Sequence, residues 1–236
     1  MENGTANLYS CEKCGGREFV YFHADDGELL VKPCECRKRS ESIRRMRRSG
    51  LETVISELTF ASYKATEKWQ QDILAAAKRY ADGFDGWFFI GGQVGSGKTH
   101  ICTAICREAL RQGKEVRYLS WRDEAQDIKR CVNDHTYIDR IEPLKRCDLL
   151  YIDDLFKGGE RDGNKTRPTV ADTNFAFDLL NFRYINKLPT VISCERFVDE
   201  IMEIDGGIGS RIYQMAKSNE IQVERKDDRN YRMVGR

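Results

Sequence analysis

Residues 92–99 read Gly-Gln-Val-Gly-Ser-Gly-Lys-Thr and fit the phosphate-loop pattern G-x-x-x-x-G-K-[ST]. An apolar run at 86–91 predicts a buried strand before it, and apolar spacing over 101–110 predicts a helix after it. Glycines let the backbone curl around phosphate oxygens, and the start of the helix adds positive partial charge. The stretch predicts a nucleoside triphosphate site formed by Gly92, Val94, Gly95, Ser96, Gly97, Lys98, Thr99 and His100.

Two carboxylates follow a second apolar run, in the sequence Cys-Asp-Leu-Leu-Tyr-Ile-Asp-Asp at 147–154. This is the Walker B pattern, in which a strand ends in acids beside the phosphate loop. Asp153 and the Thr99 hydroxyl are expected to hold Mg²⁺, while Lys98 reaches the β- and γ-phosphates. Asp154 is placed to orient or deprotonate the attacking water. We therefore expect an ATPase; the competing interpretation is that the two acids only cap a turn or helix.

Predicted strands and helices alternate along the rest of the chain. Apolar runs predict strands at 115–120, 189–194 and 220–223, and helical spacing predicts helices at 67–81 and 170–187. A polar, mobile loop is expected at 157–169, directly before the second of these helices. Such alternation is typical of a mostly parallel sheet covered on both faces. With the strands before the phosphate loop and at Walker B, the sheet has five strands.

Four of the nine cysteines lie before residue 40, as Cys11-x-x-Cys14 and Cys34-x-Cys36. Two close pairs nineteen residues apart can place four thiolates around one tetrahedral Zn²⁺. Two short apolar runs, at 19–22 and 28–31, flank an Asp-Asp-Gly turn between the pairs and predict a zinc-ribbon-like hairpin. So short a piece needs a metal to fold. The alternative is free cysteines in a disordered tail.

Charge is distributed unevenly along a chain whose net charge is only +1. Residues 37–48 hold seven Lys or Arg and one Glu, and Ser40 is a suitable cap for a basic helix there. Such a helix can meet nucleic acid or an acidic protein, or be a solvated linker. No apolar h-region opens the chain and no run of 18 apolar residues occurs, so we expect a cytoplasmic protein that is neither secreted nor membrane-spanning.

The order of these parts resembles the AAA+ ATPases of the DnaC/DnaI helicase-loader group, including phage-encoded members, which are related to IstB-type ATPases. The matching stretches cover nearly the whole chain. They are the cysteine pairs, LTFASY at 58–63, GQVGSGKTH at 92–100, YIDDLFKG at 151–158, NFRYINKLPTVIS at 181–193, CERFVDEI at 194–201, IGSRIYQM at 208–215 and NYRM at 230–233. The resemblance implies a P-loop AAA+ three-layer fold without a C-terminal helical lid after residue 225.

The resemblance also assigns roles to two further residues. Ser193 falls at the sensor-1 position, although many AAA+ proteins have Asn where this chain has Cys194-Glu195. Arg211 falls at the arginine finger, a planar cation that reaches the ATP site of a neighbouring subunit and stabilises charge on the transferred phosphoryl group. The implied catalytic set is Lys98, Asp153, Asp154, Ser193 and Arg211.

The resulting hypothesis is an ATP-dependent helicase loader in DNA replication, with three parts: a zinc module (1–39), a basic helix and linker (40–66) and an ATPase domain (67–236). Its expected partners are a replicative hexameric helicase, single-stranded DNA and further copies of itself. Trp121, Arg122, Lys129, Arg130 and Tyr137 are candidates for DNA contact. Two alternatives stay open: an IstB-like transposition-targeting ATPase acting on duplex DNA, and a zinc-stabilised DNA-binding regulator whose phosphate loop only binds nucleotide.

Overall fold

A five-stranded, fully parallel sheet forms the centre of the molecule. The computed structural model describes residues 11–46, 57–132, 134, 136–158, 160–161 and 164–233. The strand order is β4-β5-β8-β3-β9, and every neighbouring pair in this sheet is parallel. The strands are β3 (Trp87–Gly92), β4 (Val116–Ser120), β5 (Leu149–Leu155), β8 (Thr190–Cys194) and β9 (Glu220–Val223). The predicted α/β P-loop architecture is confirmed.

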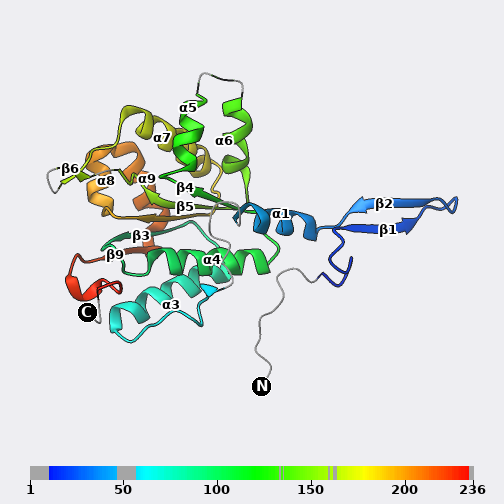
Figure 1. The fold of residues 1–236 in the computed structure, drawn as a ribbon, viewed down its shortest axis with the longest axis horizontal. Coiled ribbons are helices and arrows are strands. Elements are labelled where there is room, and N and C mark those ends of the chain that lie inside the picture. The colour runs from blue at the N-terminus through cyan, green and yellow to red at the C-terminus, as the bar shows by residue number, and fades with distance from the viewer. Residues whose placement is uncertain are drawn as a thin grey trace.

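Helices cover both faces of this sheet (Figure 1). On one face lie α3 (Lys68–Gly83) and α4 (Lys98–Arg111). On the other lie α5 (Glu124–Arg130), α6 (Thr136–Arg146), α7 (Val170–Ile185), α8 (Val198–Ile204) and α9 (Gly206–Ala216). Successive residues of β3 alternate between the two cores, Phe88 and Ile90 packing toward α3 and α4, Trp87 and Phe89 toward α7 and α9. Helical coverage on both sides explains why β3 is apolar at every position.

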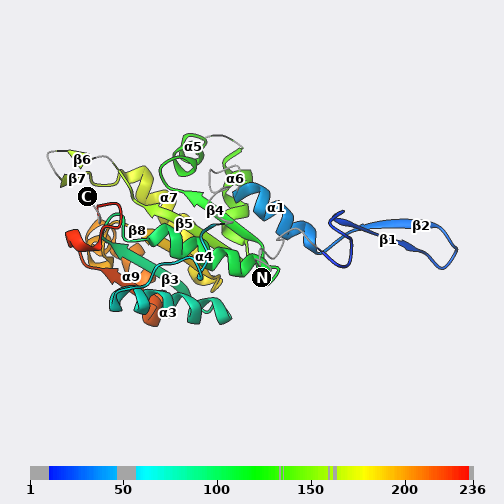
Figure 2. The same cartoon turned by 60° about the horizontal axis from the view of Figure 1, so that its bottom comes forward.

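The amino-terminal hairpin projects away from the sheet (Figures 1 and 2). Antiparallel strands β1 (Phe19–His23) and β2 (Leu29–Pro33) form it, as the sequence predicts. Helix α1 (Cys36–Met46) follows and lies beside β4 and α4. The helix begins earlier than the Ser40 cap predicts, because Cys36 belongs both to the cysteine cluster and to the first turn of α1. The predicted end of this helix at Gly50 lies outside the described residues.

The segment 157–169 is not simply a loop, because it holds a short antiparallel pair, β6 (Glu160–Arg161) and β7 (Asn164–Lys165). After β9 the chain makes a 3-10 turn at Asp227–Arg229, and residues 230–232 return to the phosphate loop. Within the described ranges, no helix combines the length and apolar character needed to cross a bilayer.

Candidate nucleotide site and cysteine cluster

The phosphate loop joins β3 to α4, as predicted, with three glycines in the left-handed region. Gly92, Gly95 and Gly97 have φ of 105°, 74° and 86°. A Cβ on Gly92 would lie 2.0 Å from the Val223 carbonyl oxygen, so a larger residue there would separate β3 from β9. The Ser96 hydroxyl donates to the Gln93 carbonyl at 2.8 Å and holds the loop closed. These contacts fix the shape of the loop before any ligand binds.

The loop opens onto a cavity of about 380 Å³. Six of the eight predicted binding residues line it, while Gly92 and Ser96 support the loop from behind. Lys98 is buried, and its ammonium donates to the carbonyls of Gly92 and Gln93 at 3.0 and 2.6 Å. The cation is therefore held in the loop by weak carbonyl acceptors, which phosphate oxygens can replace. The predicted lining residues are Val94, Gly95, Gly97, Lys98, Thr99 and His100.

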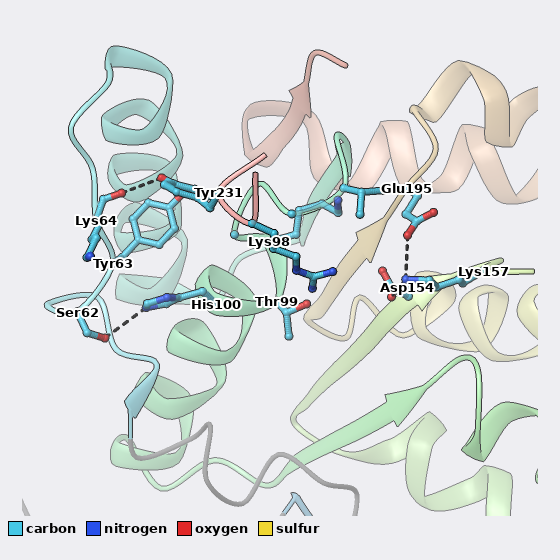
Figure 3. A pocket seen from close by; sticks show the side chains of 14 residues that line it. Ser62, Tyr63, Lys64, Lys98, Thr99, His100, Asp154, Lys157, Glu195 and Tyr231 are labelled. Carbon is cyan, nitrogen blue, oxygen red and sulfur yellow. Dashed lines mark hydrogen bonds and ion pairs between the residues drawn. The ribbon is translucent and has the colours of Figure 1, made fainter. Parts of the chain in front are cut away.

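Aromatic side chains line one end of this cavity (Figure 3). The rings of Tyr63 and His100 meet edge to face with centroids 5.2 Å apart. The Tyr231 hydroxyl donates to the Lys64 carbonyl at 2.9 Å, and the Tyr231 N–H donates to the Gly95 carbonyl at 3.0 Å. Two segments far apart in the chain thus border the phosphate loop. A flat, partly polar base can pack against such a surface.

The carboxylates of Walker B have different surroundings. Asp153 accepts hydrogen bonds from three hydroxyls: Tyr151 and Ser193 donate to Oδ1, each at 2.6 Å, and Tyr118 donates to Oδ2 at 3.0 Å. Burial and the charge of Asp153 raise the pKa of Tyr118 and Tyr151, so both stay protonated donors. Asp154, not Asp153, lines the cavity. Asp153 is thereby oriented and Asp154 exposed to ligand.

Ser193 connects the two acids. Besides donating to Asp153, its buried hydroxyl accepts the Asp154 backbone N–H at 3.0 Å. The β5–β8 register shifts between Ile152 and Leu155, so one more residue lies on β5 than on β8, and this bulge brackets the acids. Ser193 is therefore tied to the Walker B strand and does not line the cavity.

Arg211 also lies outside this cavity. Its Nε donates to Asn181 Oδ1 at 3.1 Å, and its Nη1 donates to the Gly207 carbonyl at 2.7 Å. The guanidinium lies 4.8 Å from the Phe177 ring centroid and 5.3 Å from that of Tyr184. These contacts hold the cation on the α7–α9 side, away from the nucleotide site of its own chain.

Sequence reasoning missed several residues of the cavity. Lys157 and Glu195 line it beside Asp154. Five further lining residues come from the predicted linker and from the segment after β9: Ser62, Tyr63, Lys64, Tyr231 and Arg232. Lys157 belongs to the YIDDLFKG stretch and Tyr231 to NYRM, so two of the stretches that resemble the loader family contain residues of the cavity. Spacing alone gives no indication that segments 168 positions apart meet at one loop.

Two of the candidate DNA contacts, Trp121 and Lys129, are wrong. Trp121 is 1% exposed and packs against Phe156 and Phe175, so no base can stack on it. Lys129 forms a buried ion pair with Asp172, and the Tyr137 hydroxyl donates to Asp178 at 3.2 Å. Lys129 thus joins α5 to α7, and Trp121 packs against α7 from the turn after β4. Tyr137 is half-buried and stays a candidate. Arg122 and Arg130 are exposed.

The four amino-terminal cysteines gather as predicted. Their sulfurs all lie within 4.8 Å of one another, with Cys11–Cys34 at 3.7 Å and Cys14–Cys36 at 3.4 Å. Tetrahedral zinc with Zn–S bonds of about 2.3 Å places sulfurs roughly 3.8 Å apart. The donor set and its spacing therefore fit Zn²⁺. His23 is exposed on the hairpin, away from this set.

A family model described as IstB-like ATP binding protein matches residues 28–197. The chain belongs to this family. It is 32% identical over 201 residues to a Bacillus subtilis (strain 168) protein named uncharacterized protein YqaM. The aligned region covers 80% of this chain and 62% of YqaM. It thus spans less than two thirds of that relative.

A second relative carries a functional name. The chain is 29% identical over 197 residues to the replicative helicase loader DnaC of Escherichia coli (strain K12), over 81% of this chain and 77% of DnaC. The crystal structure of the DnaC helicase loader superposes with a TM-score of 0.58 at 18% identity, over 71% of this chain and 96% of that one. The IstB-like protein described here therefore has the AAA+ fold, and its resemblance to DnaC-type loaders is confirmed.

Proposed function

We propose that this IstB-like protein is an ATP-hydrolysing helicase loader. One observation carries the proposal: a single cavity brings Lys98 and Thr99 of the phosphate loop together with Asp154 of the Walker B strand. The similarity to DnaC supports the loader role. The absence of a membrane-spanning helix from the described ranges fits a cytoplasmic site of action.

In this proposal the loop binds the ATP phosphates through backbone N–H groups and Lys98, which exchanges two carbonyl acceptors for phosphate oxygens. Thr99 and Asp153 would hold Mg²⁺, which neutralises charge on the phosphates. Asp154 would accept a proton from the attacking water as its oxygen bonds to the γ-phosphorus and the bond to ADP breaks. Ser193 would keep both acids in place through its two hydrogen bonds.

Arg211 would act on a neighbouring copy. It is not among the residues that line the cavity of its own chain, and it contacts Asn181, Phe177 and Tyr184. A guanidinium held rigidly at a surface loses little entropy when it meets phosphate. ATP sites would then be completed between subunits, so occupancy would control assembly.

The amino-terminal part would contact the helicase. Four cysteines would hold Zn²⁺ at the base of the hairpin, and metal binding would stabilise the folded state of that segment. The hairpin exposes apolar side chains on a surface with little core of its own: Phe19, Tyr21, Phe22, Leu29, Leu30 and Val31. Arg37 of α1 pairs with Glu41, and Arg44 pairs with Glu18, so these two cations are less available to nucleic acid.

The transposition-targeting alternative is favoured by the name of the matching family model. The cysteine cluster favours the loader, because transposition ATPases of this type typically lack a zinc module. Copurification of a replicative helicase, rather than a transposase, from the host would separate these two functions.

The central experiment measures ATP turnover with and without single-stranded DNA and the cognate helicase. Wild type should hydrolyse ATP, and Lys98→Ala should abolish binding and turnover. Turnover should change when helicase or single-stranded DNA is added. Nucleotide binding without any turnover, unaffected by Asp153→Ala, would instead indicate the regulator whose loop only binds nucleotide.

A further inference from the structure

Lys157 bridges two carboxylates at the end of the cavity opposite the aromatic side chains (Figure 3). Its Nζ lies 2.7 Å from Asp154 Oδ2 and 2.8 Å from Glu195 Oε1. The side chains of Lys157, Asp154 and Glu195 are 27%, 27% and 16% exposed, so the bridge is only partly screened by water. The phosphate-loop pattern does not account for this lysine.

The backbone is bent to make this bridge possible. Asp154 and Phe156 both adopt positive φ, 56° and 60°, which non-glycine residues rarely do. The Lys157 N–H donates to the Asp154 carbonyl at 2.9 Å, so the chain turns back directly after the acid. The buried Phe156 ring packs against Trp121 and anchors the turn. Strained backbone of this kind is concentrated at functional sites.

The order of residues along the cavity gives Lys157 a position relative to a nucleotide. In Figure 3, Lys98 and Thr99 lie between the aromatic end, at Tyr63 and Tyr231, and the end formed by Asp154, Lys157 and Glu195. A nucleotide whose base lies at the aromatic end, and whose first phosphates lie in the phosphate loop, would place its terminal phosphate near Lys157. Two carboxylates there repel phosphate, and the Lys157 ammonium, which contacts both of them, offsets that repulsion.

We propose that Lys157 senses the terminal phosphate and positions Asp154. Without a triphosphate, Lys157 holds Asp154 against Glu195. When ATP binds, the terminal phosphate oxygens accept hydrogen bonds from the Lys157 ammonium, and the Asp154 carboxylate becomes available to water. Because ADP has no terminal phosphate to reach it, Lys157 favours ATP over ADP. This inference rests on the proposed ATP site.

The test compares the affinities of a non-hydrolysable ATP analogue and of ADP, with Mg²⁺, for the full-length protein. Lys157→Met should weaken analogue binding about tenfold, the value of one charge-assisted hydrogen bond, and ADP binding less than about threefold. The matched control is Lys145→Met, because Lys145 forms a comparable ion pair with Asp178 outside the cavity. This control should leave both affinities unchanged. Equal losses for both nucleotides in Lys157→Met would overturn the inference.

A double-mutant cycle tests whether Glu195 acts through Lys157. Glu195→Gln should tighten analogue binding in the wild-type background, because it releases the ammonium. The same gain in a Lys157→Met background would show that Glu195 acts by its own charge and would refute the mechanism. Where Lys157→Met fails to fold, the wild-type background gives a second readout. There, Glu195→Gln should tighten analogue binding more than ADP binding, and an equal gain for both nucleotides would overturn the inference. Failure of wild type to bind either nucleotide would instead reject the ATP site itself.

Discussion

At the scale of single residues, the hydroxyl of Ser193 is the connection between the two Walker B acids. It donates to Asp153 and accepts the Asp154 N–H. Ser193→Ala leaves that partly buried N–H without its partner, so we expect a loss of about 1 kcal/mol in the free energy of unfolding. Turnover should fall on the order of tenfold because Asp154 is no longer held. Urea denaturation and steady-state ATP hydrolysis measure the two effects.

Tyr118→Phe is the matched control for that variant. It also removes a hydroxyl that donates to Asp153, at 3.0 Å, but this hydroxyl bonds the Asp153 carboxylate and not the Asp154 backbone N–H that Ser193 holds. Its turnover should fall less than that of Ser193→Ala. Equal losses in the two variants would mean that support of Asp153, not the placement of Asp154, explains the result.

The residue scale also shows where sequence reasoning reaches its limit. The spacing of the glycines and Lys98 was enough to predict the phosphate loop, because such a loop imposes that spacing on the chain. It was not enough to show that Asp154 lines the cavity and Asp153 does not. The prediction that Trp121 and Lys129 contact DNA is wrong, because the sequence alone does not show whether an aromatic or cationic side chain after a strand faces solvent or a neighbouring helix. Only the tertiary contacts of Trp121 with Phe156 and with Phe175 of α7 decide that it is buried.

At the scale of elements, the start of α7 depends on Asp172. Its carboxylate accepts from the Thr169 N–H and hydroxyl, at 2.8 and 2.7 Å, and pairs with Lys129 of α5. Burial opposes ionisation, but these partners together lower its pKa below the usual value. Asp172→Asn leaves the Lys129 ammonium buried without its counter-ion, so we expect a loss of roughly 3 kcal/mol at pH 7.

The direction of the Asp172 pKa shift determines how that loss of stability depends on pH. A lowered folded-state pKa gives stability that is complete above the unfolded value, near about 3.9, and is lost as pH falls through the folded value. The difference between wild type and Asp172→Asn should therefore shrink below about pH 4. Denaturant midpoints at a series of pH values measure it, and a difference that grows on acidification would contradict this assignment.

Most element positions were predictable, because buried strands and amphipathic helices carry the pattern of their own burial. Two features were not. Helix α1 begins at Cys36 because the cysteine cluster shapes its first turn, and residues 230–232 return to the loop through tertiary contacts alone. Arg183 shows the same limit: it is fully buried and donates to carbonyls of Leu144, Cys147 and Pro189, joining α6, α7 and β8, although arginine ordinarily marks a surface.

At the scale of the whole molecule, the hairpin and the ATPase domain should respond separately to loss of metal. Tyr21 and Val31 are 57% and 56% exposed, so the hairpin has too little core to fold by itself. We expect about one zinc per chain, bound by four thiolates. Chelation should make residues 11–35 sensitive to protease and leave nucleotide affinity of the domain within about twofold.

Cys14→Ser should reproduce the effect of chelation, and Cys131→Ser provides the control, because Cys131 lies outside the cluster. Elemental analysis reports the metal, and mass spectrometry of the proteolytic fragments reports which segment opens. A chain that keeps its zinc after Cys14→Ser, or a Cys131→Ser chain that loses it, would contradict the assignment of the ligands.

Assembly is the last property at this scale, and it depends on whether Arg211 serves a neighbouring site. Arg211→Ala and Lys98→Ala should each abolish turnover alone. In a mixed assembly, an Arg211→Ala subunit keeps its Lys98, and a Lys98→Ala neighbour supplies an intact Arg211. Random equal mixing makes about a quarter of the sites whole, so turnover should return to roughly that fraction of wild type. Arg111→Ala, which removes an exposed arginine paired with Glu108, should stay active alone and serves as the control. No recovery in assemblies shown by cross-linking to contain both variants would place Arg211 outside the neighbouring site.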